Sequence, residues 1–108
     1  MKVCLLAAIT ASICISATAF AAGDGEALFN KNGCGSCHTP AKSGIGPSLK
    51  DITAKYAGDK QAQAKLEKKV RSGGSGSFAN MMMPMPATPA SVSDADIKSM
   101  VTWILGLK

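Results

Sequence analysis

The sequence predicts an all-α domain of about four short helices joined by loops rich in glycine and proline. Apolar residues recur at helical spacing in several segments, and no segment shows the strict alternation of a half-buried strand. Glycine and proline gather between these segments, where they end helices and form turns. With 108 residues, the chain has room for one domain.

The first 21 residues have the pattern of a secretory signal peptide. Lys2 precedes an apolar run at residues 3–15, and the stretch ends in Ala19-Phe20-Ala21, which has small residues where signal peptidase requires them. A transmembrane anchor needs about 20 predominantly apolar residues, whereas this run is shorter and contains threonine and serine. We therefore expect residues 1–21 to be cleaved off together with Cys4 and Cys14, leaving an exported, periplasmic domain at residues 22–108 without a membrane anchor.

Two helices are expected in the first half of this domain. The first begins at Asp24 as its N-cap, directs Leu28 and Phe29 inward and ends near Gly33. The second begins at Ser48, whose hydroxyl caps it, and Asp51 completes a capping box. Its apolar face consists of Leu49, Ile52 and Tyr56.

Two further helices are expected in the second half. One covers residues 59–72, and Gly73-Gly74 ends it. The last begins after Ser93 and carries acidic residues at the positive end of its dipole. Its apolar face consists of Ile97, Met100, Val101, Ile104 and Leu105. We expect the first and last helices to cross, with Phe29 packed against the face that carries Trp103 and Ile104.

A long segment, residues 72–92, separates the last two helices. It is too rich in glycine and proline to be a helix, yet it is more apolar than an ordinary loop and contains four methionines. Loops of this length in compact domains are usually functional or disordered. Methionines also fill irregular gaps in cores, which is the simplest explanation for most of these four.

The most specific motif is Cys34-Gly35-Ser36-Cys37-His38. A structural zinc site needs four ligands, usually from two separated pairs, and residues 22–108 contain no second pair. A thiol–disulfide motif suits an exported protein but normally follows a strand, and no strand is expected here. The remaining interpretation is a covalent haem site, in which both thiols form thioethers and the adjacent imidazole ligates the iron.

A haem also accounts for two other features of the chain. The domain has few aromatic residues for its core, and a buried porphyrin supplies the missing apolar mass. Because His38 is the only histidine, a second axial ligand has to be another group, and a loop methionine can supply its thioether. Two alternatives stay open: a copper-handling protein that binds Cu(I) through these thioethers and the two cysteines, and a haem sensor or enzyme with an open sixth site.

Residues 22–108 resemble a class I cytochrome c of the short bacterial periplasmic type. The similarity rests on the stretches CGSCH, GPSL, KYAG, RSGGSGSF, PMP and VSDADIKSMVTWILGLK, which lie along nearly all of the domain. It implies the cytochrome c fold, in which short helices and loops wrap one covalently bound haem c.

The resemblance also implies site residues around the haem. Cys34 and Cys37 would hold it through thioethers, and His38 would ligate the iron. The carbonyl of Pro47, nine residues after His38, would accept a hydrogen bond from the imidazole and make it a stronger donor to the iron.

The sixth ligand is expected to be Met85, with Met83 as the alternative. The family's Pro-Met-Pro pattern before the last helix matches Met85, whereas the usual interval from the aromatic at Phe78 leads to Met83. We favour Met85 because prolines on both sides hold its backbone extended. Thr88 stands where the family often has an asparagine that hydrogen-bonds the ligand sulfur.

The function that the resemblance implies is single-electron transfer by a soluble periplasmic protein of a respiratory chain. Iron ligated on both sides leaves no open position for a substrate, so we expect a monomeric carrier rather than an enzyme. Its partners would be redox proteins, such as a terminal oxidase or reductase and an upstream cytochrome, and not nucleic acid. The formal net charge is +5, and lysines near the haem edge would steer acidic partners. The candidate lysines are Lys31, Lys42, Lys50, Lys55, Lys60, Lys65, Lys68 and Lys69.

Overall fold

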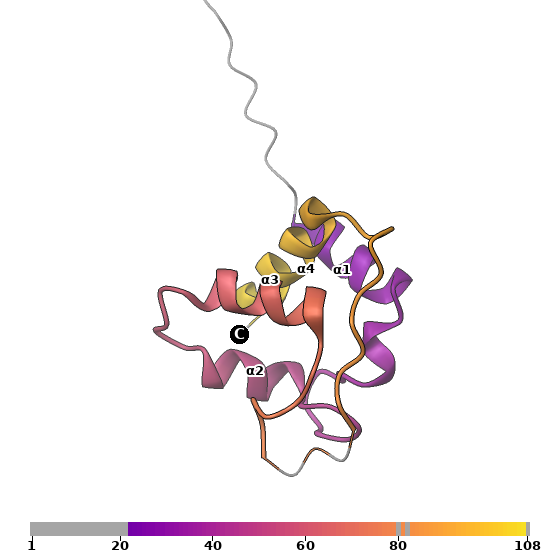
Figure 1. Cartoon of the computed structure of the whole chain (residues 1–108). Coiled ribbons are helices and arrows are strands. Elements are labelled where there is room, and N and C mark those ends of the chain that lie inside the picture. The colour runs from indigo at the N-terminus through magenta and orange to yellow at the C-terminus, as the bar shows by residue number, and fades with distance from the viewer. Residues whose placement is uncertain (1–21, 80, 82, 108) are drawn as a thin grey trace, which may run out of the picture.

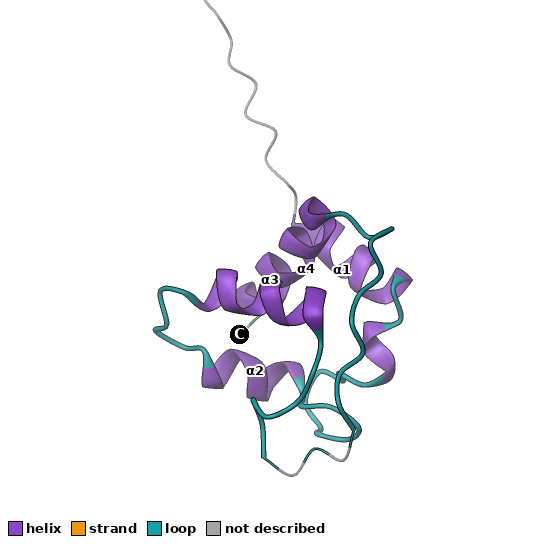
Figure 2. Ribbon diagram, viewed as in Figure 1, coloured by secondary structure: helices purple, strands orange, loops and turns teal. Residues whose placement is uncertain are grey.

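The computed structural model describes residues 22–79, 81 and 83–107, and these residues form an all-α fold (Figure 1, Figure 2). The helices are α1 (Ala22–Lys31), the short 3-10 helix η1 (Cys34–Ser36), α2 (Leu49–Lys55), α3 (Ala62–Ser72) and α4 (Asp94–Gly106). Among the described residues, the one strand-like pairing is an isolated bridge between Gly74 and Met85. The predicted all-α fold with four α-helices is confirmed. The predicted signal peptide, with Cys4 and Cys14, lies outside the described residues.

Helices α1 and α4 cross each other, as Figure 1 shows near the top of the molecule. The rings of Phe29 and Trp103 lie with their centroids 5.1 Å apart and their planes tilted by 52°. A side chain at Gly25 would collide with the carbonyl oxygen of Ser99 and the Cβ of Trp103, so glycine permits this close approach. The predicted crossing of the first and last helices is confirmed.

The apolar core draws on all four α-helices. Its buried members are Phe29, Leu49, Ile52, Leu66, Ile97, Met100, Val101 and Ile104. Half of these side chains come from α4, against which α1, α2 and α3 all pack. Burying a side chain of this size contributes roughly 1.5–3 kcal/mol to folding. Helix α4 is therefore the centre of the core.

The predicted caps of α2 and α4 are present. The hydroxyl of Ser48 accepts the backbone N–H of Asp51 at 3.0 Å, and that of Ser93 accepts the N–H of Asp96 at 3.1 Å. Both serines have extended backbone dihedral angles, so the helical conformation begins only at the residue after each of them. These two helix starts are set by local side-chain chemistry.

The starts of the other two helices differ from the prediction. Helix α1 begins at Ala22, so Asp24 lies within its first turn rather than at the N-cap; alanine is a strong helix former and extends the helix. Helix α3 begins at Ala62 instead of residue 59. The Asp59 carboxylate accepts the N–H of Gln61 at 2.8 Å, which holds residues 59–61 in a turn before the helix.

None of the helices within the described ranges combines the length and the apolar character needed to cross a bilayer.

Candidate functional site

A cavity of about 490 Å³ opens between the helices and the loop that follows α3. Its wall contains apolar side chains from α1, α2, α3 and α4, and six of the eight buried core residues contribute to it. It is also lined by every predicted site residue, namely Cys34, Cys37, His38, Pro47, Met83 and Met85. The structure thus brings together chemical groups that lie up to about fifty residues apart in the chain.

The two cysteines of the motif lie on and just after η1. The N–H of Cys37 and the N–H of His38 both donate to the carbonyl of Cys34, at 3.2 and 3.0 Å, which closes a tight turn. Both side chains are partly buried, they are not joined in a disulfide, and both line the same cavity. Partial burial raises the pKa of the Cys34 thiol, against the opposing effect of a backbone hydrogen bond. This turn was not predicted from the sequence.

His38 is oriented by Pro47. The Nδ1 atom of His38 lies 2.9 Å from the carbonyl oxygen of Pro47. Because a carbonyl can only accept, Nδ1 carries the proton, and Nε2 of the neutral ring keeps its lone pair. A Cβ at Gly46 would lie 3.0 Å from Cε1 of His38, so the loop needs glycine here to pass the ring. The imidazole is therefore presented as a ligand with a fixed tautomer.

Met85 is held by its backbone against the end of α3. Its N–H donates to the carbonyl of Gly74 at 2.9 Å, and its carbonyl accepts the N–H of Gly74 at 2.8 Å. Gly73 has a φ of 65°, and a Cβ there would collide with the carbonyl oxygen of Met85. The preceding glycine pair therefore allows the loop to approach α3 closely at this methionine.

The two candidate methionines differ in burial. Met85 is half-buried, whereas the side chain of Met83 is exposed, at 62% of its accessible area. Met81 is half-buried and also lines the cavity, and Met82 lies outside the described residues.

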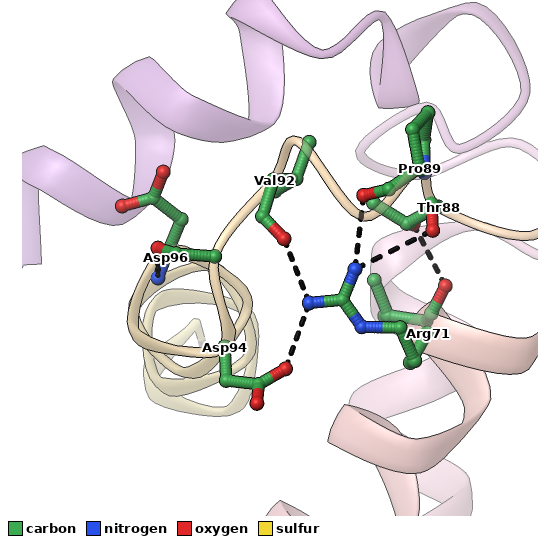
Figure 3. Close-up of polar contacts among 8 residues, drawn as sticks. Arg71, Thr88, Pro89, Val92, Asp94 and Asp96 are labelled. Atoms are coloured by element: carbon green, nitrogen blue, oxygen red, sulfur yellow. Dashed lines mark hydrogen bonds and ion pairs between the residues drawn. The ribbon is translucent and has the colours of Figure 1, made fainter.

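Two polar residues near this loop make contacts that were not predicted from the sequence. Arg71, the only arginine of the chain, hydrogen-bonds three backbone carbonyls of the loop and pairs with Asp94 (Figure 3). Thr88, which stands where the family often has an asparagine that bonds the ligand sulfur, donates its hydroxyl proton to the carbonyl of Val70 at 2.7 Å. The sequence did carry a signal for the Arg71 contacts: it has one arginine among many lysines, and arginine offers several donors in a planar fork.

The lysines proposed to steer partners have different surroundings. Lys69 lines the cavity, and Lys65 forms an ion pair with Asp59 at 2.7 Å. The ammonium of Lys55 lies 4.6 Å from the ring centroid of Phe78 and donates to the carbonyl of Ser77.

Comparison with known proteins decides among the interpretations of the motif. The Cytochrome c family model matches residues 22–108. The chain belongs to the cytochrome c family. It is 41% identical over 108 residues to cytochrome c-552 of Nitrosomonas europaea, with the whole of both chains covered. It is 49% identical to cytochrome c-551 of Allochromatium vinosum over 80 residues, which are 74% of this chain and 82% of that protein.

Solved structures agree with this assignment. The crystal structure of wild-type cytochrome c552 of Nitrosomonas europaea has a TM-score of 0.69 and 43% identity, and the match covers 77% of this chain and 99% of that one. The class 1 cytochrome MtoD of Sideroxydans lithotrophicus has a TM-score of 0.68 and 33% identity, with coverage of 81% and 96%. The fold of this chain is the cytochrome c fold.

Family membership identifies the chain as a haem protein, in preference to a zinc, thiol–disulfide or copper protein. This cytochrome carries one covalently bound haem c, and its function is electron transfer. The cavity suits that group, because an apolar wall surrounds two thiols, one imidazole and one anchored thioether.

Proposed function

We propose that this cytochrome is a periplasmic carrier whose haem is attached to Cys34 and Cys37 and whose iron is ligated by His38 and Met85. The observation that carries this assignment is that one apolar cavity is lined by all four side chains. The thiols come from a single turn, which suits two attachment points on one edge of a macrocycle. The imidazole directly follows this turn, and the thioether comes from a distant loop.

The chain's own residues would hold the ligands still during electron transfer. When bound, the haem iron takes up and releases one electron. The bond from His38 to Pro47 fixes the ring and strengthens it as a donor. The hydrogen-bonded pair of Met85 and Gly74 restrains the backbone that bears the thioether. Ligands that move little between the two oxidation states favour fast transfer.

Met85 is a better candidate than Met83 for two structural reasons. Its backbone is paired with Gly74 on both its N–H and its carbonyl, and its side chain is half-buried at the cavity. The more exposed Met83 would bind the iron only if more of its surface were withdrawn from water. An anchored backbone lowers the entropy lost when a weak thioether ligand is held in place.

A carrier role without enzymatic activity follows from two axial ligands supplied by the protein. No position on the iron would then remain for a substrate, in contrast to a sensor or enzyme with an open sixth site. We propose redox proteins with acidic docking surfaces as partners, because the chain has a net charge of +5 and Lys69 lies at the cavity. A terminal oxidase or reductase and an upstream cytochrome fit this role.

Export is proposed from residues 1–21, which would be cleaved after Ala21. The mature domain, residues 22–108, would then acquire its haem in the periplasm and act there as a monomer without a membrane anchor.

The ligand assignment is tested by Met85→Ala and Met83→Ala, singly and together. Met85→Ala is expected to abolish the near-infrared band of methionine-ligated ferric haem, to open the reduced protein to carbon monoxide and to lower the reduction potential. Met83→Ala is expected to retain the band. If Met83→Ala loses the band and Met85→Ala keeps it, the ligand is Met83. If the double variant keeps a wild-type spectrum, the loop has no role at the iron.

A further inference from the structure

The contacts of Arg71 form a bridge between three elements of the fold. Arg71 lies in the last turn of α3, and Figure 3 shows its guanidinium pointing into the bend that precedes α4. Its Nη1 donates to the carbonyl of Pro89 at 2.9 Å and to that of Thr88 at 3.4 Å. Its Nη2 donates to the carbonyl of Val92 and to Oδ1 of Asp94, both at 2.7 Å.

The backbone carbonyls matter more in this bridge than the ion pair does. The side chain of Asp94 is 95% exposed, whereas that of Arg71 is 33% exposed. Water therefore screens the attraction between the two charges. The carbonyls belong to one bend, and the planar fork of arginine can reach several of them at once. Lysine would present a point charge with fewer directed donors.

The same turn of α3 holds the loop at two more points. The hydroxyl of Thr88 donates to the carbonyl of Val70 at 2.7 Å, and Met85 is paired with Gly74 through two backbone hydrogen bonds. The hydroxyl has only one proton, so the Thr88 side chain does not donate to the sulfur of Met85. The restraint on Met85 therefore acts through the backbone, from Gly74 on one side and from the Arg71 contacts on the other.

We infer that Arg71 is a positioning residue for the methionine ligand: its guanidinium fixes residues 88–94 against the end of α3 and thereby holds the Met85 thioether at the iron. This inference rests on the proposed role of Met85. Loss of the guanidinium leaves the loop held only at Gly74 and through the contacts of Thr88 with the end of α3, so the thioether is expected to dissociate more often. A competing ligand then gains access to the sixth position.

The test is the affinity of imidazole for the oxidised holoprotein at neutral pH, measured alongside the near-infrared band. Arg71→Gln is expected to bind imidazole at least about tenfold more tightly than wild type, the change that loss of one charge-assisted hydrogen bond would produce. Arg71→Lys keeps the positive charge but loses the planar fork of donors, and its imidazole affinity is expected to lie between those of wild type and Arg71→Gln. Thr88→Val removes only the hydroxyl contact and is expected to show a smaller increase than Arg71→Gln.

Two controls separate positioning from general destabilisation. Lys65→Gln removes a positive charge and an ion pair from the same helix without touching the loop, and it is expected to leave imidazole affinity unchanged. Trp103→Ala removes the ring that packs on Phe29, and Trp103 lies away from the loop and is not part of the cavity lining; its unfolding midpoint is expected to fall while its imidazole affinity stays close to wild type.

The outcomes distinguish this inference from the ligand assignment. If Met85→Ala binds imidazole no more tightly than wild type, Met85 is not the ligand and both proposals fail. If Met85→Ala binds it more tightly but Arg71→Gln and Arg71→Lys do not, only the role of Arg71 is overturned. Should Arg71→Gln fail to accumulate as holoprotein, Arg71→Lys and Thr88→Val decide the matter by the same measurement. Equal tightening in Lys65→Gln would also overturn it.

Discussion

Two segments that line the cavity differ greatly in construction: the cysteine–histidine segment, residues 34–47, and the methionine loop, residues 73–92. The first segment brings two thiols and an imidazole within five consecutive residues, and its second anchor, Pro47, follows shortly after. The second contributes one anchored thioether from a loop whose contacts reach back to α3 and forward to α4.

This difference predicts unequal strength on the two sides of the haem. Under the proposed ligation, covalent bonds and short-range hydrogen bonds would hold the haem on the cysteine–histidine side, so local sequence would suffice. On the methionine side, a weak thioether would depend on contacts that join residues 11 to 23 positions apart, such as Gly74 with Met85 and Arg71 with Asp94. Perturbation of the tertiary structure is therefore expected to release the methionine first.

The largest expected effect is loss of covalent attachment in Cys34→Ser and Cys37→Ser. Each serine removes one thioether, so holoprotein yield is expected to fall to a small fraction of wild type. Acid–acetone extraction of purified protein measures attachment: haem stays with the wild-type chain. Ser36→Ala, an exposed position between the cysteines, is the matched control and is expected to behave as wild type. Ready extraction of haem from the wild type would contradict covalent attachment.

The next effect lies at the helix crossing, outside the two segments. Phe29→Ala removes a buried ring that packs on Trp103, and it is expected to lower the free energy of unfolding by about 3–5 kcal/mol. The near-infrared band should persist, because the substitution changes no residue of the cysteine–histidine segment or of the methionine loop, although Phe29 also lines the cavity. Chemical denaturation followed by circular dichroism measures the change, with the exposed Thr102→Ala as control. Unchanged stability in both Phe29→Ala and Trp103→Ala would show that this packing is not what holds the crossing.

A smaller effect is expected at Gly73, where the methionine loop meets α3. Gly73→Ala forces a left-handed φ of 65° on a residue with a side chain and drives its Cβ into the carbonyl of Met85. Backbone strain of this kind costs about 1–3 kcal/mol, and the near-infrared band should weaken as Met85 shifts. Gly58→Ala has a similar φ of 76° with open space around the new Cβ. If Gly58→Ala loses a similar amount of stability but keeps the band, the loss of the band in Gly73→Ala comes from the collision with Met85 and not from backbone strain. An intact band in Gly73→Ala would contradict the prediction, because the loop would then tolerate the shift.

The smallest expected effect is on the pH dependence of stability, through a hydrogen bond between Ser43 of the cysteine–histidine segment and Asp51. The hydroxyl of Ser43 donates to the Asp51 carboxylate at 2.5 Å, and this bond, together with one from Ser48, lowers the pKa of Asp51. A lowered pKa stabilises the fold above the unfolded value of about 3.9, and this contribution disappears as pH falls through the folded value. Asp51→Asn should therefore be slightly less stable than wild type at neutral pH and should match it in strong acid. Unfolding midpoints between about pH 2 and 7 measure the convergence, and a constant gap across that range would argue against this bond.

The amino-acid sequence alone predicted most of the fold and the composition of the site. The helical apolar faces, the serine caps at Ser48 and Ser93 and the crossing of the terminal helices all depend on short-range patterns or on one large aromatic pair. The motif at residues 34–38 likewise brings two thiols and an imidazole together within five residues, although the turn that arranges them was not predicted. Such features can be read directly because the interacting groups are neighbours in the chain.

Only the tertiary structure decided how the methionine side is built. The sequence favoured Met85 with Met83 as the alternative but showed nothing of the contacts that hold either one, and it started α3 three residues too early. It gave no sign that the hydroxyl of Thr88 donates to the carbonyl of Val70. It also said nothing of the guanidinium of Arg71 in the bend before α4. These contacts depend on how a long loop closes against a distant helix end. Residue spacing carries no information about that path, because many loop conformations satisfy the same local preferences.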